Sequence, residues 1–497
     1  MKIKSVTINN FRSIEHATIN MHDYSIIVGE NNAGKSNIID AIRYFYGDID
    51  LTLRDLGCFS SVASGEPWVE IEYDMTPVEY MALPEEYRIN KNKLRVQKVV
   101  KYFKPDDSFE TVYRCPGVKR KWRNALKGDN DIRNFLGKII YIPAVFNNQV
   151  SYKSAINSLS TLMCKDLKQN IENALSDLDA RIIKPHLETV DQTLNSENQW
   201  PGVQLNLSLR PNSAESFLAS RLMLNVVDNE MPVSIEILGT GMQRIIMSNI
   251  IKKGSESGSK ETTILLFEEP EANMHSNAIE DLAYNLRQFA KAENQQVIAT
   301  THSGQLVSED VMDIRGLIRV DKQNGLTCIH QNKMPDAELE LAKNLVYFDR
   351  PRSDIFFAKK VVLVEGPTEY SLYNYLKKRG DLPHSLTRDV TLIDSIGKWP
   401  MPYFQKILNN YNIRHSILYD TDGDPNRPDN VAVKNEFSEL TDYSYGFPRD
   451  IETFCGIKKS GNPAINIINK FQDGTVDAKK QAEIVKIFTD LITQKKK

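Results

Sequence analysis

The sequence predicts an α/β protein with parallel sheets, and three short stretches carry this prediction. Each is an apolar run of strand length that ends in a glycine or a carboxylate, and two of them lead directly into a helical pattern. Strands of a parallel sheet deliver the residues at their carboxyl ends to one edge, where functional groups collect. The three runs are residues 25–28, 263–267 and 361–364.

Composition narrows the class of protein. The chain has 497 residues, enough for about three domains. Its hydrophobic fraction of 41% and net charge of −3 are ordinary, so any surface for nucleic acid must be local. The five cysteines are scattered without a C-x-x-C pair, which argues against a disulfide framework or zinc ribbon and suits a reducing cytosol. The sequence has no apolar run of membrane-spanning length, so we expect a cytoplasmic protein with no membrane partner.

Residues 29–36 fit the phosphate-loop pattern G-x-x-x-x-G-K-[ST]. A strand is expected before this loop and an amphipathic helix, 37–45, after it, so backbone N–H groups and the positive helix end would face phosphates. Lys35 would contact the β- and γ-phosphates, and the Ser36 hydroxyl would hold Mg²⁺. The predicted ATP-binding residues of this loop are Gly29, Asn31, Asn32, Gly34, Lys35 and Ser36.

Three further elements complete a predicted ATPase. The run 263–267 ends in Glu268, expected to hold Mg²⁺ through water, and Glu269, expected to orient the attacking water. The strand pattern from residue 296 ends in His302, which would sense the γ-phosphate. Before a helix at 245–250 lies a loop that contains Gly239, Gly241 and Gln243. A simple glycine turn is the alternative interpretation of that loop.

The order of these elements resembles the ABC-type ATPase heads of SMC and RecF-like proteins, as does the opening stretch 10–14. In those proteins a signature loop, here 238–244, caps the nucleotide held by a second subunit. The resemblance therefore implies a homodimer or higher homo-oligomer. Glu268 departs from the aspartate that is commoner at this position.

A second chemical centre begins after residue 352. The run 361–364 delivers Glu365, and the following helix is expected to begin near Glu369. A later run, 416–419, delivers Asp420 and Asp422. Clustered carboxylates repel one another unless hard cations neutralise them, and Mg²⁺ or Mn²⁺ suits such ligands. The alternative is an ordinary polar turn.

This second pattern resembles the Toprim fold, and the two centres together resemble the OLD (overcoming lysogenization defect) family. The resemblance implies that Glu365, Asp420 and Asp422 hold one metal, with Glu369 and Glu452 at the other and Asp450 in reserve. Two metals would activate water and stabilise the leaving oxygen of a phosphodiester. The family also uses a late lysine, and Lys458, Lys459 and Lys470 all remain open for that role.

The predicted architecture is an ABC/SMC-like head with a helical insertion, followed by a Toprim domain. The insertion has apolar residues at helical spacing, and both self-association and coverage of the sheet remain open. The expected parts are 1–150, the ATPase with its phosphate loop; 151–200, the helical insertion; 201–352, the rest of the ATPase; and 353–497, the Toprim nuclease domain.

By resemblance the function is a nucleotide-regulated, metal-dependent DNA endonuclease acting in anti-phage defence. Family members occur alone and in systems such as Gabija and retrons, which allows a helicase, or a reverse transcriptase with non-coding RNA, as partner. The alternative is an ATP-switched DNA-binding scaffold of SMC or RecF type with a non-catalytic Toprim domain. Topoisomerase-like strand passage would need a separate breakage domain, for which the chain leaves little room.

Overall fold

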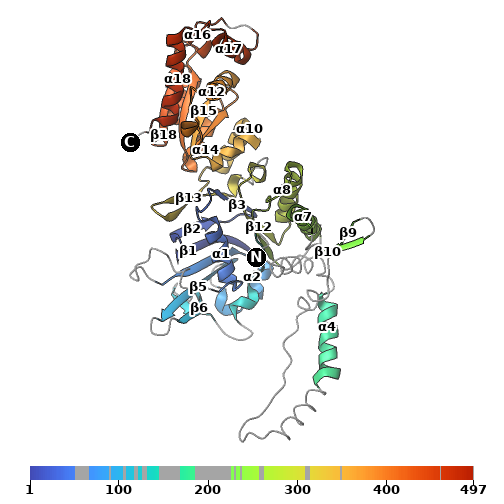
Figure 1. Cartoon of the computed structure of the whole chain (residues 1–497). Helices are drawn as coiled ribbons and strands as arrows, with labels where there is room; N and C mark the ends of the chain where they lie inside the picture. The colour runs from blue at the N-terminus through green and yellow to red at the C-terminus, as the bar shows by residue number, and fades with distance from the viewer. Residues whose placement is uncertain are drawn as a thin grey trace. The chain divides into compact units, whose positions relative to one another are not determined.

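The computed structural model describes residues 1–50, 66–88, 91–103, 108–116, 121–125, 131–144, 168–184, 225–228, 231–234, 238–256, 262–307, 314–346, 350–458 and 461–495. By its internal packing the chain divides into two units (Figure 1). One unit holds residues 3–136 and 298–497, and the other holds residues 137–297. Each unit is described by itself.

The amino-terminal part of the first unit contains two sheets. One is built mainly from antiparallel pairs in the order β2-β1-β4-β5-β6-β7, and the other contributes the run β14-β13-β3-β12. Strand β3 is buried along its whole length, as its continuous apolar pattern predicts. The strands are β1 (Lys2–Phe11), β2 (Ile14–Asn20), β3 (Tyr24–Gly29), β4 (Trp68–Asp74), β5 (Lys93–Phe103), β6 (Ser108–Pro116), β7 (Trp122–Asn124), β12 (Gln295–Thr301), β13 (Leu317–Gln323) and β14 (Leu326–Gln331); the helices are α1 (Lys35–Tyr46), α2 (Pro77–Ala82), α10 (Asp336–Val346) and α11 (Arg350–Ser353).

The second unit contains a parallel pair of strands and two long helices that pack together. Asn285 of one helix donates a hydrogen bond of 2.8 Å to the Ser248 hydroxyl of the other, so the packed face includes a buried polar contact. The elements are β8 (Lys138–Ile142), α4 (Lys168–Leu178), β9 (Asn225–Asp228), β10 (Met231–Ser234), α7 (Thr240–Glu256), β11 (Thr263–Glu268) and α8 (Ser276–Lys291).

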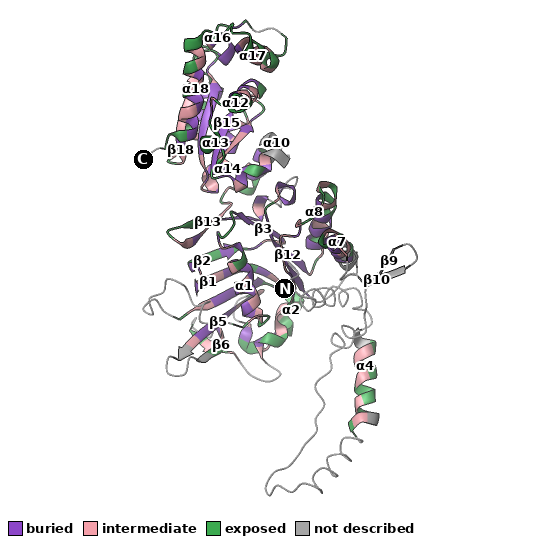
Figure 2. Cartoon of the chain, in the orientation of Figure 1, coloured by how far each residue is buried: buried purple, intermediate pink, exposed green. Residues whose placement is uncertain are grey.

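The carboxyl-terminal part of the first unit is a parallel sheet in the order β16-β15-β17-β18. Helices α12, α17 and α18 share one apolar core with it, and α14 contacts β17. Buried residues run along these strands in Figure 2, which is typical of a sheet covered by helices. The elements are β15 (Lys360–Val364), α12 (Pro367–Arg379), α13 (His384–Thr387), β16 (Val390–Asp394), α14 (Met401–Asn410), β17 (Arg414–Asp420), α15 (Pro428–Asn435), β18 (Thr441–Phe447), α16 (Ile451–Phe454), α17 (Pro463–Gln472) and α18 (Ala478–Thr493).

A buried arginine joins the two parts of the first unit. The Arg319 guanidinium, on β13, donates to the backbone oxygens of Tyr411 at 3.1 Å and Ala358 at 3.4 Å. The hydroxyl of the fully buried Tyr411 donates in return to the Ile314 oxygen at 2.8 Å. The start of the parallel sheet is therefore joined to β13 by buried hydrogen bonds.

The predicted α/β class is confirmed, with one local difference. Helix α7 begins at Thr240, so Gly241 and Gln243 lie in its first turn rather than in a preceding loop. Within the expected insertion at 151–200 the structure describes 168–184, where α4 forms. The rest of that prediction lies outside the described residues.

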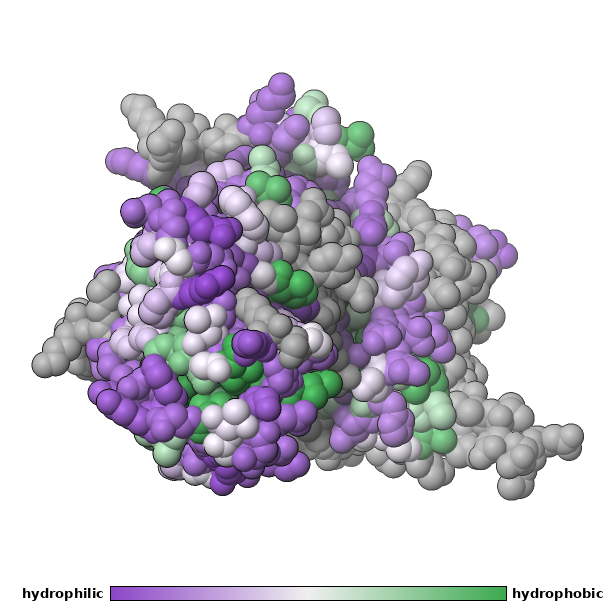
Figure 3. Space-filling view, turned by 90° about the horizontal axis from the view of Figure 1, so that it is seen from above, coloured by the Kyte–Doolittle hydropathy of each residue, from purple (hydrophilic) through white to green (hydrophobic). Residues whose placement is uncertain are grey.

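The surface shown in Figure 3 mixes hydrophilic and hydrophobic side chains, and the hydrophobic ones lie in patches separated by hydrophilic residues. Across the described residues, no helix combines the length and the apolar character needed to cross a membrane.

Candidate active site and nucleotide site

The phosphate loop connects β3 to α1, as its sequence predicts. Gly29 and Gly34 both have positive φ, 152° and 111°. A Cβ at Gly29 would lie 2.1 Å from the Val320 oxygen, and one at Gly34 would lie 2.2 Å from the Thr327 hydroxyl oxygen. Only glycine fits such close approaches, so β13 and β14 set the shape of the loop. The Lys35 ammonium donates to the backbone oxygens of Gly29 at 2.9 Å and of Glu30 at 3.0 Å.

The turn between β1 and β2 contacts the helix that follows this loop and the strand packed against it. Arg12 forms an ion pair of 2.5 Å with Asp40 on α1. Ser13 accepts a hydrogen bond of 2.7 Å from Asn37, and its hydroxyl lies 2.7 Å from that of Thr327. The stretch that resembles the opening of ABC-type heads thus fixes the first turn of the phosphate-loop helix.

The remaining nucleotide candidates of the first unit are more open. Asn31, Asn32 and Ser36 are exposed, and Asn32 has a φ of 64°. His302 directly follows β12, the neighbour of β3 in the sheet, and is also exposed. The structure thus brings His302 to the strand beside the phosphate loop.

The second unit holds the acidic strand and the start of α7. Glu268 ends β11 and accepts a hydrogen bond of 2.8 Å from the Tyr141 hydroxyl, and Glu269 has a φ of 42°. At Gly241 a Cβ would lie 2.4 Å from the Asn273 oxygen, so this glycine lets the helix approach the turn after β11. The Gln243 side chain donates to the Leu238 oxygen at 3.1 Å. Gly239 is exposed, with no atom within 4 Å of an added Cβ.

The parallel sheet gathers carboxylates at one edge. Val364 lies beside Asp394 and Leu418 in the strand register, so the residues that follow β15, β16 and β17 meet at the same end. The Glu365 Oε2 atom accepts a hydrogen bond of 3.0 Å from the Asp420 backbone N–H. The two acidic strands predicted from the sequence are therefore adjacent, and their terminal carboxylates belong to one site.

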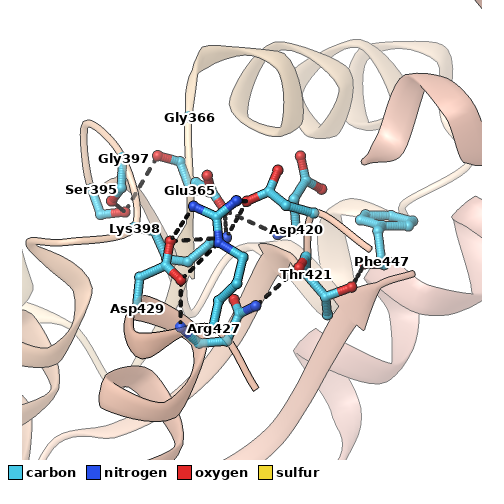
Figure 4. Close-up of polar contacts among 12 residues, drawn as sticks. Glu365, Gly366, Ser395, Gly397, Lys398, Asp420, Thr421, Arg427, Asp429 and Phe447 are labelled. Carbon is cyan, nitrogen blue, oxygen red and sulfur yellow. Dashed lines mark hydrogen bonds and ion pairs between the residues drawn. The ribbon is translucent and has the colours of Figure 1, made fainter. Parts of the chain in front are cut away.

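Two basic side chains lie on one side of this site. The Lys398 ammonium is 2.8 Å from Asp422 Oδ2, 3.7 Å from Asp429 Oδ2 and 3.8 Å from Glu365 Oε2. The Arg427 guanidinium lies 3.2 Å from Asp422 and 3.1 Å from Asp429. Figure 4 shows both basic side chains among the carboxylates of Glu365 and Asp429. We call Glu365, Asp422 and Asp429 the lysine-side carboxylates.

Three other acidic residues, Glu369, Asp420 and Glu452, lie on the helical side, and we call them the helix-side carboxylates. Glu369 is 3% exposed and accepts a hydrogen bond of 3.1 Å from the Gly366 N–H. Glu452, on α16, is equally buried and accepts a bond of 3.4 Å from the Thr368 hydroxyl. Asp450 caps α16 by accepting from the Thr453 N–H at 2.7 Å.

The pKa values of four of these carboxyl groups are shifted, three upward and one downward. Burial, and then the repulsion of Glu365 and Glu452, raises the pKa of Glu369 to about 8. Burial and the surrounding carboxylates raise the pKa of Asp420 to about 9. Burial also raises the pKa of Glu365. For Asp429 burial acts in the same direction, but Lys398 and Arg427 outweigh it and lower the pKa.

These residues suit a hard divalent cation. Their donors are carboxylate oxygens, and Asp420 Oδ1 is buried without a hydrogen-bond partner, a costly arrangement that a cation would relieve. In the described part of the chain, no three carboxylate, imidazole or thiol side chains already stand at the spacing of metal ligands. Bringing a cation in therefore requires the carboxylates to move toward it.

Sequence reasoning assigned no role to Lys398, which the structure places among the lysine-side carboxylates. The late lysines do not lie at the site in the same way: Lys470 pairs at 3.6 Å with Asp473, which directly follows its helix; Lys458 is exposed; and Lys459 lies outside the described residues. Lys398 follows β16, and only the sheet order places β16 next to β15. The sequence signal that could have pointed to Lys398 is its position directly after Gly397 in a turn.

The fold and the site thus define an ATPase of the phosphate-loop class joined to a Toprim domain. Residues 25–308 match the family described as "AAA domain, putative AbiEii toxin, Type IV TA system". Residues 356–422 match "Overcoming lysogenization defect protein-like, TOPRIM domain". The chain belongs to this family of AAA domains, and an OLD-like Toprim domain follows.

Three curated relatives are similar to this chain over most of its length. The "Old nuclease" of Escherichia phage P2 is 24% identical over 85% of this chain and 77% of its own length. The "Endonuclease GajA" of Bacillus cereus strain VD045 is 23% identical over 85% and 75%. The "OLD nuclease" of Thermus scotoductus is 22% identical over 84% and 82%.

Among solved structures, SMC heads are similar at low scores. An SmcHead bound to the C-winged helix domain of ScpA has 15% identity and a TM-score of 0.39 over 68% of this chain and 99% of that chain. The SMC head domain from Thermotoga maritima has 15% identity and a TM-score of 0.35 over 67% and 100%.

Proposed function

We propose that this protein is a metal-dependent DNA endonuclease whose Toprim centre hydrolyses phosphodiesters under the control of ATP. The observation that carries the proposal is the meeting of Glu365 and Asp420 at the ends of β15 and β17, with Glu369 and Glu452 buried beside them. Such a concentration of buried carboxylates is stable only when protons or cations neutralise it. The nuclease names of the relatives support this activity.

The cofactors of the Toprim centre are Mg²⁺ or Mn²⁺ ions, because the donors are carboxylate oxygens. Glu365, Asp420 and Asp422 would hold one ion, and Glu369 and Glu452 the other, with Asp450 as the alternative ligand. Bound there, divalent ions supply an activated water and stabilise the leaving oxygen. Asp450 already caps α16, which favours Glu452 as the free donor.

The protein's own residues orient these donors. The Asp420 N–H fixes Glu365, the Gly366 N–H fixes Glu369, and the Thr368 hydroxyl fixes Glu452. Each carboxylate keeps a second oxygen for a ligand, since one hydrogen bond occupies one oxygen. Positioning of this kind leaves little reorganisation for the reaction itself.

The ATPase would act as the regulator of this centre. ATP would bind the phosphate loop through Gly29, Asn31, Asn32, Gly34 and Lys35, with Mg²⁺ held by Ser36 and Glu268. Glu269 would orient the attacking water, and His302 would contact the γ-phosphate. Gly239, Gly241 and Gln243 would reach the nucleotide of a second subunit, which makes a homodimer the expected assembly. The exposed backbone at Gly239 supports such a contact.

Plasmid cleavage tests the proposal. Supercoiled DNA is incubated with the full chain and Mg²⁺ or Mn²⁺, with and without ATP, alongside Glu365→Gln and Asp420→Asn. The matched control is Asp424→Asn, an exposed carboxylate in the same loop. We expect at least ~100-fold slower cleavage by the first two variants and a normal rate for the control. Cleavage at the wild-type rate by Glu365→Gln would remove the nuclease assignment and favour an ATP-switched DNA-binding scaffold.

Lys35→Ala tests the control by ATP separately. We expect it to abolish ATP hydrolysis while leaving metal-dependent DNA cleavage that no longer responds to ATP.

A role in anti-phage defence, alone or with a helicase or a reverse transcriptase and its RNA, is the proposed biological setting. Plaque counts on cells that express wild type or Asp420→Asn test it, because protection should require the intact Toprim centre.

A further inference from the structure

The carboxylate site is divided unequally in charge. Lys398 and Arg427 lie against the lysine-side carboxylates at 2.8–3.8 Å. None of the helix-side carboxylates forms an ion pair with a described lysine or arginine. One half of the site thus already contains cationic charge, and the other half does not.

Lys398 is built into this position. It is 5% exposed, whereas lysines are almost never fully buried unless they are paired. The turn that carries it is fastened to the end of β15: the Ser395 hydroxyl donates to the Val364 oxygen at 2.7 Å, and the Gly397 N–H donates to the Glu365 oxygen at 2.7 Å. The ammonium therefore arrives from backbone that is fixed to the same strand as Glu365.

The backbone of the turn is strained in a way that supports a specific role. Ile396 has a φ of 55°, although a β-branched residue strongly avoids the left-handed region. Gly397, with a φ of 105°, follows it directly. Such strain persists only where surrounding contacts hold it, and it clusters at functional sites. Across the site, Asp422, the closest ion-pair partner of Lys398, also has a positive φ, 52°.

We propose that the Lys398 ammonium is an internal cation that holds one of the two cation positions of the carboxylate site. The protein then takes one divalent ion by itself, among the helix-side carboxylates, with Asp420 shared between the two cation positions. A second ion binds tightly among the lysine-side carboxylates only when the Lys398 ammonium is displaced or removed. This inference rests on the proposed metal-dependent function and specifies how its site fills.

Electrostatics explains why the lysine and the second ion exclude each other. An ammonium 2.8 Å from Asp422 would repel a divalent ion placed on the same carboxylates, and a low-dielectric site strengthens that repulsion. The scissile phosphate offers Lys398 an alternative anion. Movement of the ammonium to the phosphate would free Asp422 and Glu365 at the moment when the second ion is needed.

Counting bound Mn²⁺ tests the proposal without measuring cleavage. Free Mn²⁺ is titrated by its electron paramagnetic resonance signal against the full chain, with neither nucleotide nor DNA. Wild type should bind one Mn²⁺ per chain tightly, and Lys398→Met should bind two. The second Mn²⁺ of the variant should bind at least ~10-fold more tightly than any second Mn²⁺ of wild type.

Two further variants separate charge from packing. Lys398→Arg keeps the positive charge and should stay at one Mn²⁺. Lys360→Met removes another buried lysine, which pairs with Asp442 at 3.2 Å on a different part of the sheet, and should also stay at one. Because Lys398→Met leaves buried carboxylates uncompensated, its melting temperature is followed as well. Mn²⁺ should raise that temperature more for Lys398→Met than for wild type.

The outcomes distinguish this inference from the proposed function. Equal stoichiometry and affinity in wild type and Lys398→Met would overturn the role of Lys398 and leave the nuclease proposal standing. Failure of wild type to bind any Mn²⁺, or unchanged binding in Asp420→Asn, would overturn both. Two tight Mn²⁺ ions in Lys398→Met, with one in wild type, Lys398→Arg and Lys360→Met, would establish the internal cation.

Discussion

Replacing Asp420 by asparagine should make the metal-free protein more stable, although it removes a proposed ligand. The pKa of Asp420 is raised to about 9 by burial and by the neighbouring carboxylates. At neutral pH the folded chain therefore holds this carboxyl protonated, whereas the unfolded chain, with a pKa of about 3.9, releases the proton. Asparagine carries no charge in either state, so it removes this cost.

The sign and the size of this change in stability follow from the difference in proton binding between the folded and unfolded chain. A carboxyl whose pKa is raised by folding leaves stability intact below about pH 4, and stability is lost as the pH rises toward about 9. Since pH 7 lies about three units above the pKa of the unfolded carboxyl, the loss of unfolding free energy from this group is at most about 4 kcal/mol. The carboxylates share their protons, so we expect ~1–3 kcal/mol for this single replacement.

Scanning calorimetry of the full chain in EDTA, at pH 5 and pH 7.5, measures the effect. The free energy of unfolding of Asp420→Asn should exceed that of wild type at pH 7.5 and approach it at pH 5. Asp442→Asn is the matched control: Asp442 is buried at the start of β18, but its ion pairs with Arg414 and Lys360 outweigh burial and lower its pKa. A lowered pKa contributes stability that is lost as the pH falls, so this variant should be less stable at pH 7.5. If Asp420→Asn is destabilising at pH 7.5, or has the same effect at both pH values, the electrostatic reasoning is wrong.

Three other replacements test separate parts of the molecule. Trp399→Ala removes a side chain that is 63% exposed beside Lys398, and loss of base stacking should weaken DNA binding in Ca²⁺ by ~5- to 100-fold. The control is Tyr284→Ala, at a side chain 56% exposed on α8, which should bind DNA normally. Equal binding by both variants would exclude this DNA contact. Gly34→Ala should weaken binding of a fluorescent ATP analogue at least ~10-fold, because its Cβ would lie 2.2 Å from the Thr327 hydroxyl oxygen. Gly47→Ala, with open space around its added Cβ, should leave the affinity unchanged. An unchanged affinity in Gly34→Ala would show that the loop can open without cost. Arg319→Ala should lower the free energy of unfolding by ~3 kcal/mol in chemical denaturation, since buried backbone oxygens lose their hydrogen-bond donor. A loss below ~0.5 kcal/mol would mean that water replaces the guanidinium as donor.

Much of the fold and part of the candidate site could be predicted from the sequence, because the informative residues follow strands. The runs before Gly29 and Glu365 are buried strands, and Asp420 ends a third. A parallel sheet gathers the ends of its strands wherever they lie in the sequence, so the pairing of Glu365 with Asp420 follows from strand type alone.

The contribution of β16 could not be predicted in this way. Its burial is only partial, and nothing local indicates that it lies beside β15 at the sheet edge. Lys398 depends on that placement, because its partner Asp422 follows a different strand. The start of α7 was misjudged for a related reason. Gly241 looks like a loop residue, but it serves close packing against the Asn273 oxygen within a helix.

The two centres differ in how complete they are before a ligand arrives. At the phosphate loop the Lys35 ammonium already bonds to two backbone oxygens, and the glycines fit their neighbours closely. At the Toprim centre Asp420 Oδ1 has no hydrogen-bond partner, and the pKa of Glu369 is raised to about 8. We therefore expect a nucleotide to meet a phosphate loop whose shape is set in advance, and a divalent ion to displace protons and draw carboxylates together. Since proton release becomes easier as the pH rises, cation binding and cleavage should strengthen between pH 6 and pH 9, while ATP binding should change little over the same range.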